Sequence, residues 1–251
     1  MIALEQGHNF RDIGGYETDD GRRIRRGRVF RSGTLALLTD EDQRQLAGLG
    51  IKLICDFRTT NERRARPTRW LEPNSVDFWS RDHHGSVGEL IAAMNHPDIS
   101  ADAIRERMLQ TYRDLPFEQA DTLREMFHRI AAGSLPMIFH CSVGKDRTGI
   151  AAALLLSALG VPREVVVSDY LVTEQFFEKS CRLVFADSQS KRSAVPERAI
   201  WEPMMRADRE YIEAMFRTVT DRHGSIDGYL RDVLGWSEQS QAALRHEMLV
   251  V

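Results

Sequence analysis

Apolar residues along the chain follow two patterns, short continuous runs and longer segments with helical spacing. The segments 51–57 and 135–140 are short, apolar and bounded by turn residues, which is typical of buried strands. The segments 85–132 and 148–159 carry apolar residues at helical spacing and are predicted to be helical. Strands that alternate with helices in this way predict an α/β fold. The residues with this spacing include Ile104, Met108 and Tyr112, and then Leu123, Met126, Phe127 and Ile130.

The remaining segments are predicted from turn and capping residues. Short strands and turns are expected over 9–35, and a capping-box pattern predicts a helix over 40–48. Several helices are expected over 163–250, with a polar loop near 187–198. No linker is long or polar enough to separate two domains, so residues 1–251 are expected to form a single domain.

Composition excludes several classes of protein. The chain has 251 residues, 42% hydrophobic and 28% charged, as is usual for globular proteins. Its net charge of −3 provides no basic excess, so we expect no nucleic-acid partner. Three widely spaced cysteines exclude a disulfide scaffold. The sequence leaves the oligomeric state open.

Membrane and export signals are not visible in the sequence. The longest apolar run, 150–161, is shorter than the roughly 20 residues that a spanning helix needs. The first residues lack the basic start and apolar core of a signal peptide. We therefore expect no transmembrane segment and a cytoplasmic location, with export by a route without a classical signal left open.

The most informative stretch is His140-Cys141-Ser142-Val143-Gly144-Lys145-Asp146-Arg147-Thr148-Gly149, between a predicted strand and a predicted helix. A tight loop that leads into a helix turns backbone N–H groups inward and forms a cradle for anions. The cradle and the helix dipole together favour the thiolate form of a cysteine. Cys141 is therefore the candidate nucleophile. Arg147, in a Cys-x5-Arg spacing, is the candidate for holding two phosphoryl oxygens with its planar guanidinium.

Other residues of this loop complete the candidate phosphate site. Ser142 and Val143 would supply backbone N–H groups, and Gly144 allows the backbone to come close to the anion. Lys145 would add a point charge to the cavity. The Thr148 hydroxyl could hydrogen-bond the sulfur and help it leave in a second step.

Each feature also has an ordinary structural interpretation. A lone cysteine after a strand is usually an inert core residue, and a lone arginine at a helix start is usually a surface charge. The combination of strand, Cys-x5-Arg, glycine and helix favours the phosphate site over these interpretations. A Walker loop is excluded, because Phe139 and Asp146 occupy the positions of its first glycine and its Ser or Thr.

The loop resembles the signature loop of cysteine-dependent tyrosine phosphatases. Its Gly-Lys-Asp-Arg-Thr-Gly ending is similar to an atypical subgroup of tyrosine and dual-specificity phosphatases from bacteria and fungi, some of which also cleave phosphoinositides. The resemblance extends over nearly the whole chain. The matching elements are Asn9-Phe10-Arg11-Asp12-Ile13-Gly14-Gly15, Arg31-Ser32-Gly33, Asp56-Phe57-Arg58, Asp169-Tyr170-Leu171 and the stretch from Gly224 to Leu230.

This resemblance implies a fold and a mechanism. The fold would be that of the cysteine phosphatases, a mostly parallel central sheet flanked by helices, with additional helices over 85–132 and 165–215 as a lid. In the mechanism, Cys141 would attack phosphorus and form a phosphocysteine, which water would hydrolyse. No metal and no cofactor would take part, and His83-His84 shows no ligand spacing.

The general acid is the open assignment. Conventional tyrosine phosphatases carry it on a Trp-Pro-Asp loop, which this sequence lacks. By resemblance to the atypical subgroup, Asp146 ranks first. Asp56 ranks second because it ends the neighbouring strand, and Asp114 ranks third because it lies in a predicted helix. Asp56 is equally well explained as an ion-pair partner of Arg58 or of an arginine from the N-terminal region. Arg58 is also a candidate phosphate-binding residue.

Two further residues near the loop have supporting interpretations. His140 is expected to order the loop by a hydrogen bond rather than act as a base. Cys55 is expected to be a buried strand residue, and a reversible disulfide with Cys141 is a minor hypothesis.

The leading functional hypothesis is a phosphomonoester hydrolase of the protein-tyrosine-phosphatase type. Its expected partner is a phosphorylated protein, with phosphotyrosine alone or with dual specificity, or a phosphoinositide. Lys145 motivates the lipid option, because a second cation suits a polyphosphorylated head group. The alternatives are a non-catalytic phosphate-binding module and a sulfurtransferase or arsenate reductase, which also place a cysteine in an anion-binding loop.

Overall fold

A computed structural model describes residues 4–70, 76–82, 99–190 and 197–251. Its centre is a five-stranded sheet in the order β1-β3-β6-β4-β5. The strands are β1 (Arg11–Asp12), β3 (Val29–Ser32), β4 (Leu53–Asp56), β5 (Asp77–Ser80) and β6 (Met137–His140). Only the pairing of β1 with β3 is antiparallel. The predicted α/β class with a mostly parallel central sheet is therefore confirmed.

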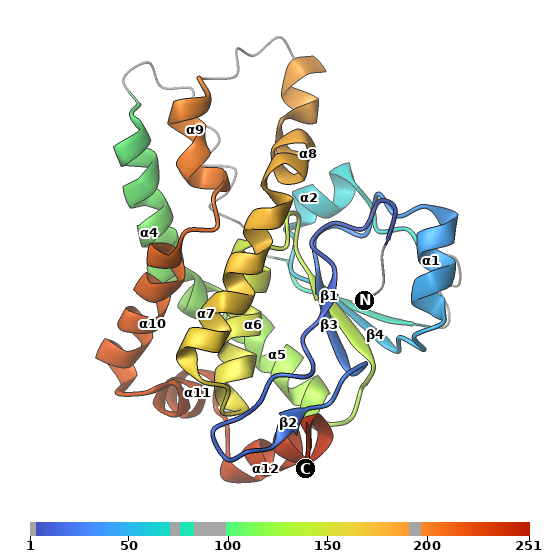
Figure 1. The fold of residues 1–251 in the computed structure, drawn as a ribbon, viewed down its shortest axis with the longest axis vertical. Helices are drawn as coiled ribbons and strands as arrows, with labels where there is room; N and C mark the ends of the chain where they lie inside the picture. Colours follow the sequence, from blue (N-terminus) through green and yellow to red (C-terminus); the bar gives the residue numbers. More distant parts are fainter. Residues whose placement is uncertain (1–3, 71–75, 83–98, 191–196) are drawn as a thin grey trace.

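Helices cover both faces of the sheet (Figure 1). Alternate strand residues point to opposite faces, so Ile54 and Ile138 pack with Leu46 of α1 (Asp40–Ala47). Cys55 and Phe139 point to the other face, into the larger core. That core is built with α4 (Ala101–Glu118), α5 (Ala120–Ala131) and α6 (Asp146–Ala158). Burial on both faces explains why the strands are continuous apolar runs rather than alternating ones.

Most of the predicted elements are present. The strands predicted over 51–57 and 135–140 are β4 and β6, and the helices predicted over 40–48 and 148–159 are α1 and α6. Part of the predicted helical region 85–132 forms α4 and α5, and residues 83–98, which include His83-His84, lie outside the described residues. In the described part of the chain, no helix is both long and apolar enough to cross a membrane.

The second half of the chain is helical, as predicted. It contains, in chain order, α7 (Arg163–Leu171), the short 3-10 helix η2 (Val172–Phe176), α8 (Phe177–Ser190), α9 (Arg198–Met205), α10 (Arg209–His223), α11 (Ile226–Leu234) and α12 (Glu238–Met248). The polar loop expected from 187 was placed too early, because α8 continues to Ser190. Figure 1 shows α4, α8 and α9 extending together beyond one end of the sheet.

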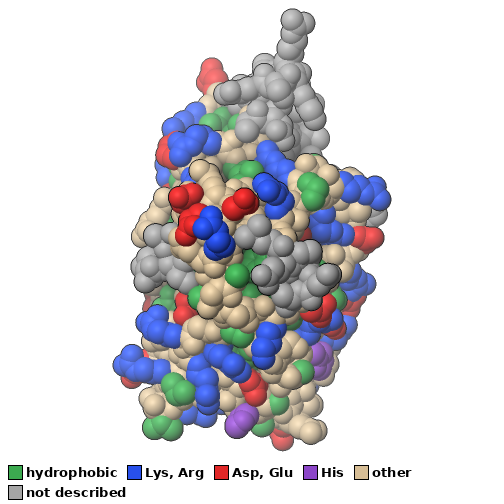
Figure 2. Space-filling view, turned by 90° about the vertical axis from the view of Figure 1, so that its right-hand side faces the viewer, with side chains coloured by type: hydrophobic (Ala, Val, Ile, Leu, Met, Phe, Trp, Pro, Cys, Tyr) green, Lys and Arg blue, Asp and Glu red, His purple; other side chains and the backbone are tan. Residues whose placement is uncertain are grey.

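A small second sheet joins an N-terminal strand to the C-terminal end of the chain. Strand β2 (Arg23–Ile24) pairs with β7 (Leu249–Val250), which follows α12 directly. On the face shown in Figure 2, acidic and basic side chains are interspersed and hydrophobic side chains form only small groups. This mixture agrees with the nearly balanced net charge.

The register of the three central strands places the matched motifs at one edge of the sheet. Ser32 and Asp56 both pair with His140, so β3, β4 and β6 end at the same level. The residues that follow each strand therefore lie side by side at the carboxyl edge, where ligands of parallel sheets bind. Helix α2 (Thr60–Ala65) begins a few residues beyond β4 at this edge.

Candidate active site

The loop of residues 141–145 connects β6 to the first turn of α6, as predicted. Gly144 adopts a φ of 77°, which favours glycine. A Cβ atom at this position would lie 2.7 Å from both the nitrogen of Gly33 and the carbonyl oxygen of Ser32. The loop can therefore pack this closely against the end of β3 only with glycine at position 144.

The carbonyl oxygen of Gly144 is fixed from outside the loop. It accepts hydrogen bonds from Asn9 Nδ2 at 2.8 Å and from an Arg31 Nη atom at 3.0 Å. Arg31 also pairs with Asp169 at 2.6 Å, and both side chains are almost completely buried. Burial raises the pKa of Asp169, but attraction to Arg31 and Arg11 outweighs burial and lowers it to about 2. The motifs around residues 9, 31 and 169 thus form one support behind the loop.

Cys141 lines a pocket of about 220 Å³ together with Arg147. The thiol is buried, and the backbone N–H of Gly144 donates to Sγ at 3.2 Å. A backbone donor at the sulfur and the N-terminus of α6 beside it both favour negative charge. The other lining residues are Thr34, Arg58, Glu62, Ala65, Arg66, Ser142, Val143, Asp146, Leu183 and Val184. Leu183 and Val184 belong to α8, so this helix borders the pocket.

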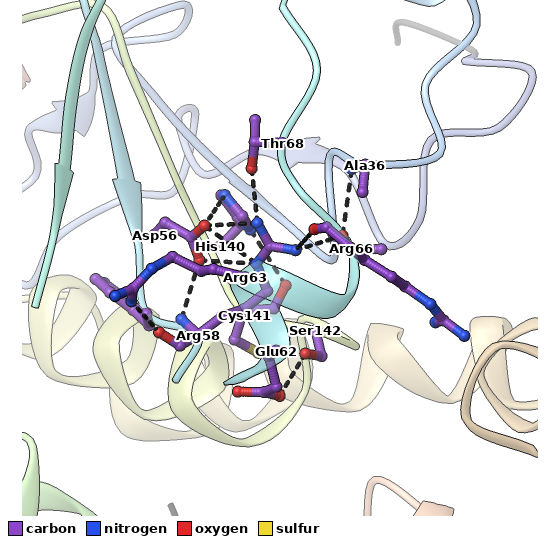
Figure 3. Close-up of polar contacts among 12 residues, drawn as sticks. Ala36, Asp56, Arg58, Glu62, Arg63, Arg66, Thr68, His140, Cys141 and Ser142 are labelled. Carbon is purple, nitrogen blue, oxygen red and sulfur yellow. Dashed lines mark hydrogen bonds and ion pairs between the residues drawn. The ribbon is translucent and has the colours of Figure 1, made fainter. Parts of the chain in front are cut away.

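Glu62 is a site residue that the sequence analysis missed. It accepts from Arg147 at two positions, with Oε2 2.7 Å from Nη1 and Oε1 2.8 Å from Nη2. Ser142 Oγ also donates to Glu62 (Figure 3). Burial acts to raise the pKa of Glu62, but its bonds with Arg147 and Ser142 outweigh burial and hold it well below its usual range. The available signal was the Thr59-x-x-Glu62 capping box at the start of α2.

Arg147 keeps two N–H groups for a ligand. Its Nη1 donates to Glu62 and to the Phe57 carbonyl oxygen at 2.9 Å, and one Nη2 hydrogen is used by Glu62. A guanidinium has five N–H donors. Within the described residues, the Nε–H and the second Nη2–H therefore have no protein acceptor. These two groups lie on one edge of the guanidinium, in the geometry that binds two phosphoryl oxygens.

Asp146 lines the same pocket, with its side chain 22% exposed. Its Oδ1 accepts from the Tyr112 hydroxyl at 2.8 Å and lies 3.2 Å from Lys145 Nζ. The hydroxyls of Tyr112 and Tyr170 are 2.7 Å apart, and both side chains are buried. The carboxyl group is thus fixed through one oxygen, which leaves Oδ2 for chemistry in the pocket.

Lys145 does not line the catalytic pocket. Its ammonium group donates to the carbonyl oxygens of Met204 and Arg206, the second at 3.1 Å, and is buried beside Asp146. The structure therefore places this cation behind the loop, between α6 and the end of α9, rather than in the anion cradle.

Asp56 and Arg58 form a buried ion pair. The shortest contact, from Arg58 Nη2 to Asp56 Oδ2, is 2.6 Å, and Arg58 also donates to Thr68 (Figure 3). Arg58 lines the pocket, whereas Asp56 does not. His140 lies beside this pair, with Nε2 3.7 Å from Asp56 and Nδ1 3.2 Å from the Cys141 carbonyl oxygen. Burial lowers the pKa of His140, which favours the neutral imidazole.

The remaining candidates are placed as follows. The Thr148 hydroxyl is buried and has no hydrogen-bond partner among the described residues, so it makes no bond to the Cys141 sulfur here. Asp114 lies on α4, accepts from Gln110 and is not a lining residue of the pocket. Cys55 pairs in register with Phe139, two positions before Cys141, and burial raises the pKa of its thiol. No disulfide links the three cysteines. Among the described residues, no group of His, Cys, Asp and Glu could hold a metal ion.

A buried thiol beside a helix N-terminus, with an arginine in the first turn of that helix lining the same pocket, fits a cysteine-dependent phosphatase. Comparison with known proteins agrees with this class. A family model described as the tyrosine phosphatase family matches residues 2–250. The chain belongs to this family, and it is a phosphatase of the protein-tyrosine-phosphatase type.

Individual relatives cover most of the chain. A protein of Cupriavidus necator assigned to the tyrosine-protein phosphatases is 32% identical over 93% of this chain and 84% of its own length. The triple specificity protein phosphatase PtpB of Mycobacterium tuberculosis is 29% identical over 96% of both chains. Among solved structures, TpbA of P. aeruginosa in complex with phosphotyrosine matches 77% of this chain and 89% of its own at 16% identity, with a TM-score of 0.27. That last similarity is too low to support an argument.

Proposed function

We propose that the protein hydrolyses phosphotyrosine through a phosphocysteine on Cys141. The observation that carries this proposal is the pairing of Sγ with the Gly144 N–H in a pocket that also presents the two remaining N–H groups of Arg147. The thiolate attacks phosphorus, and the bond from phosphorus to the leaving oxygen breaks. Arg147 and the loop N–H groups stabilise the negative charge on the equatorial oxygens in both steps.

Asp146 is proposed as the general acid. Its Oδ2 gives a proton to the leaving oxygen in the first step. In the second step, the carboxylate takes a proton from the attacking water, which releases inorganic phosphate and regenerates the thiolate. Support comes from its place in the pocket and from the two groups that hold Oδ1. Asp56 is instead proposed to hold Arg58, because its carboxylate is used by that arginine.

The substrate range is proposed to extend beyond phosphotyrosine to phosphoserine and phosphothreonine. The name of the Mycobacterium tuberculosis relative indicates a triple specificity, which supports this breadth. Hydrolysis of phosphoinositides is a weaker proposal for this chain. Lys145, which motivated it, is bonded to carbonyl oxygens outside the pocket. Besides Arg147, the cations that do line the pocket are Arg58 and Arg66.

A substrate panel tests the proposal. It comprises peptides with each phosphorylated residue and soluble phosphoinositides, assayed with wild type, Cys141→Ser and Asp146→Asn. We expect Cys141→Ser to abolish all turnover and Asp146→Asn to lower kcat by about 10²- to 10⁴-fold for tyrosine substrates. Cys181→Ser, which changes a cysteine of α8 that does not line the pocket, is the matched control and retains activity. Turnover that survives Cys141→Ser would falsify the cysteine mechanism. Transfer of sulfur from thiosulfate to cyanide would instead favour the sulfurtransferase alternative.

A further inference from the structure

A second and larger pocket adjoins the catalytic one. It has a volume of about 570 Å³ and shares the lining residues Arg66 and Leu183 with the catalytic pocket, so these two residues lie between the neighbouring pockets. Its walls come from the segment before β1, the turn before α1, the residue that follows α2, and α8. The described residues that line it are Glu5, Gln6, His8, Leu37, Arg66, Lys179, Arg182 and Leu183.

Charge in this second pocket is predominantly positive. Arg66, Lys179 and Arg182 are cations, and Glu5 is the one carboxylate among the described residues that line the pocket. Glu5 is exposed and accepts from Thr39 at 3.1 Å. Burial, and then the charge of Lys179, lower the pKa of His8 to about 4, so the imidazole is neutral at pH 7. The described lining residues, three cations and one carboxylate, thus carry a surplus of two positive charges beside the thiol pocket.

The cations are held in different ways. Lys179 donates to the Gly7 carbonyl oxygen at 2.8 Å, which fixes its ammonium group at the pocket wall. Arg66 donates to the Leu183 carbonyl oxygen at 3.1 Å, and its own carbonyl oxygen accepts from Arg58 of the catalytic pocket. Arg182 is exposed on α8 and forms no ion pair with any described residue. Arg182 is therefore the cation best placed to receive an incoming anion.

We propose that this second pocket is a subsite for an acidic side chain that flanks phosphotyrosine in a peptide substrate. The proposal rests on the proposed function and names its substrate class. The catalytic pocket takes the phosphorylated ring, and the peptide continues past Arg66 and Leu183 into the larger pocket. Leu37 and Leu183 contact the apolar stem of an Asp or Glu side chain, while Arg182 and Lys179 attract its carboxylate.

An extended peptide suits this arrangement better than a small head group does. Successive residues of an extended chain advance by about 3.3 Å, so a residue one to three positions from phosphotyrosine reaches a neighbouring pocket. The second pocket is more than twice as large as the catalytic one, and it combines apolar and basic walls.

The test compares two phosphotyrosine peptides that differ only in their flanking residues, Glu on both sides against Gln on both sides. The quantity measured is the ratio of their kcat/KM values. We expect wild type to prefer the acidic peptide, and Arg182→Gln and Lys179→Gln each to lower this ratio by about two- to fivefold. Arg182→Lys keeps the charge and most of the ratio. Arg217→Gln, at an exposed arginine of α10 that lines neither pocket, keeps the wild-type ratio.

The outcomes separate this proposal from the proposed function. If the wild-type protein does not hydrolyse free phosphotyrosine, both the proposed function and the subsite are contradicted. Turnover that depends on Cys141 but shows equal kcat/KM for the two peptides overturns the subsite alone. A third arm uses a soluble phosphoinositide. If Arg182→Gln reduces only phosphoinositide hydrolysis and leaves the peptide ratio intact, the second pocket serves a phosphorylated head group and the peptide proposal is wrong.

Discussion

The Tyr112 hydroxyl donates to Asp146 Oδ1 at 2.8 Å and is itself 2.7 Å from the hydroxyl of Tyr170. Two buried tyrosines from α4 and α7 therefore orient a carboxyl group that belongs to the first turn of α6. Because Oδ1 is engaged, the proton for the leaving group is carried on Oδ2 in the mechanism proposed above. Tyr112 acts through Asp146 and does not touch the substrate, so it is a positioning residue.

Tyr112→Phe is expected to weaken acid catalysis while leaving the ring packing in place. A poor leaving group needs protonation more than a good one, so kcat should fall by about tenfold for phenyl phosphate and less for p-nitrophenyl phosphate. The measurement is the ratio of the two kcat values. Tyr229→Phe is the matched control, because it also loses one buried hydroxyl bond, to the Pro116 carbonyl oxygen. An equal fall for both substrates would show that Tyr112 has only a structural role.

Asp56→Asn is expected to affect stability more than acid catalysis. It leaves the Arg58 guanidinium, which is 1% exposed, without its carboxylate, at a cost of about 3–5 kcal/mol in the free energy of unfolding. The ratio of kcat values for phenyl and p-nitrophenyl phosphate should stay near that of wild type. Urea unfolding measures the first effect. The double variant Asp56→Asn/Arg58→Met removes the unpaired charge and should recover part of the stability. A fall in kcat for phenyl phosphate that is much larger than the fall for p-nitrophenyl phosphate would indicate that Asp56 is the general acid.

Glu62→Gln is expected to misplace the phosphate-binding edge of Arg147. An amide cannot accept from both Nη atoms as the carboxylate does, and a displaced guanidinium binds the transition state less well. We expect kcat/KM for phosphotyrosine to fall by about 10- to 100-fold. Glu247→Gln is the control. Glu247 pairs with Arg28 at 2.6 Å and does not line the pocket, and its side chain is 25% exposed, compared with 26% for Glu62. Equal losses in both variants would contradict the special role of Glu62.

Gly144→Ala is expected to inactivate the enzyme through a collision rather than through backbone strain alone. Its Cβ would lie 2.7 Å from backbone atoms of Ser32 and Gly33. Gly224 provides the matched control. Its φ of 75° is close to the 77° of Gly144, but an added Cβ atom at Gly224 would have no atom within 4 Å. Gly224→Ala should therefore cost only the backbone strain of its φ and ψ, on the order of 1–3 kcal/mol, and keep activity. Thermal unfolding and phosphotyrosine turnover distinguish the two variants, and full activity of Gly144→Ala would contradict the packing argument.

His8 is expected to make the protein less stable in mild acid. Its pKa in the folded state, about 4, lies below the unfolded value near 6.5, because burial, and then the charge of Lys179, disfavour the protonated imidazole. The unfolded state therefore binds the proton more readily, so stability is full above pH 6.5 and falls as the pH drops towards 4, by up to about 3 kcal/mol. His8→Gln should flatten this dependence. The check is the free energy of unfolding at pH 7 and pH 4.5, and an unchanged slope in the variant would contradict the assignment.

The sequence was sufficient for the fold class and for the strand-loop-helix at Cys141, because both depend on local patterns. The continuous apolar runs at 51–57 and 135–140 indicate strands that are buried on both faces. The residues of the signature loop follow one another in the sequence. Residues brought in from distant segments were not predictable in this way. Glu62 reaches Arg147 across 85 positions of sequence, and Tyr112 reaches Asp146 across 34.

The position of Lys145 illustrates the same limit. Sequence places it inside the loop next to Asp146, and an anion cradle suggested that its charge would face the phosphate. Its long stem instead carries the ammonium group to carbonyl oxygens at the end of α9. That choice depends on where α9 packs, which no spacing within the loop specifies.

The two hydrogen bonds that Asn9 and Arg31 make to the Gly144 carbonyl oxygen also determine the polarity of the loop. In a trans peptide, the C=O and the following N–H point in opposite directions. Holding this oxygen on the outer side therefore turns the Lys145 N–H to the opposite side, and a flip of this peptide would exchange a donor for an acceptor. Without these two distant side chains, the same loop could present a carbonyl oxygen where the anion binds. Asn9 and Arg31 thus stabilise one orientation of the Gly144–Lys145 peptide.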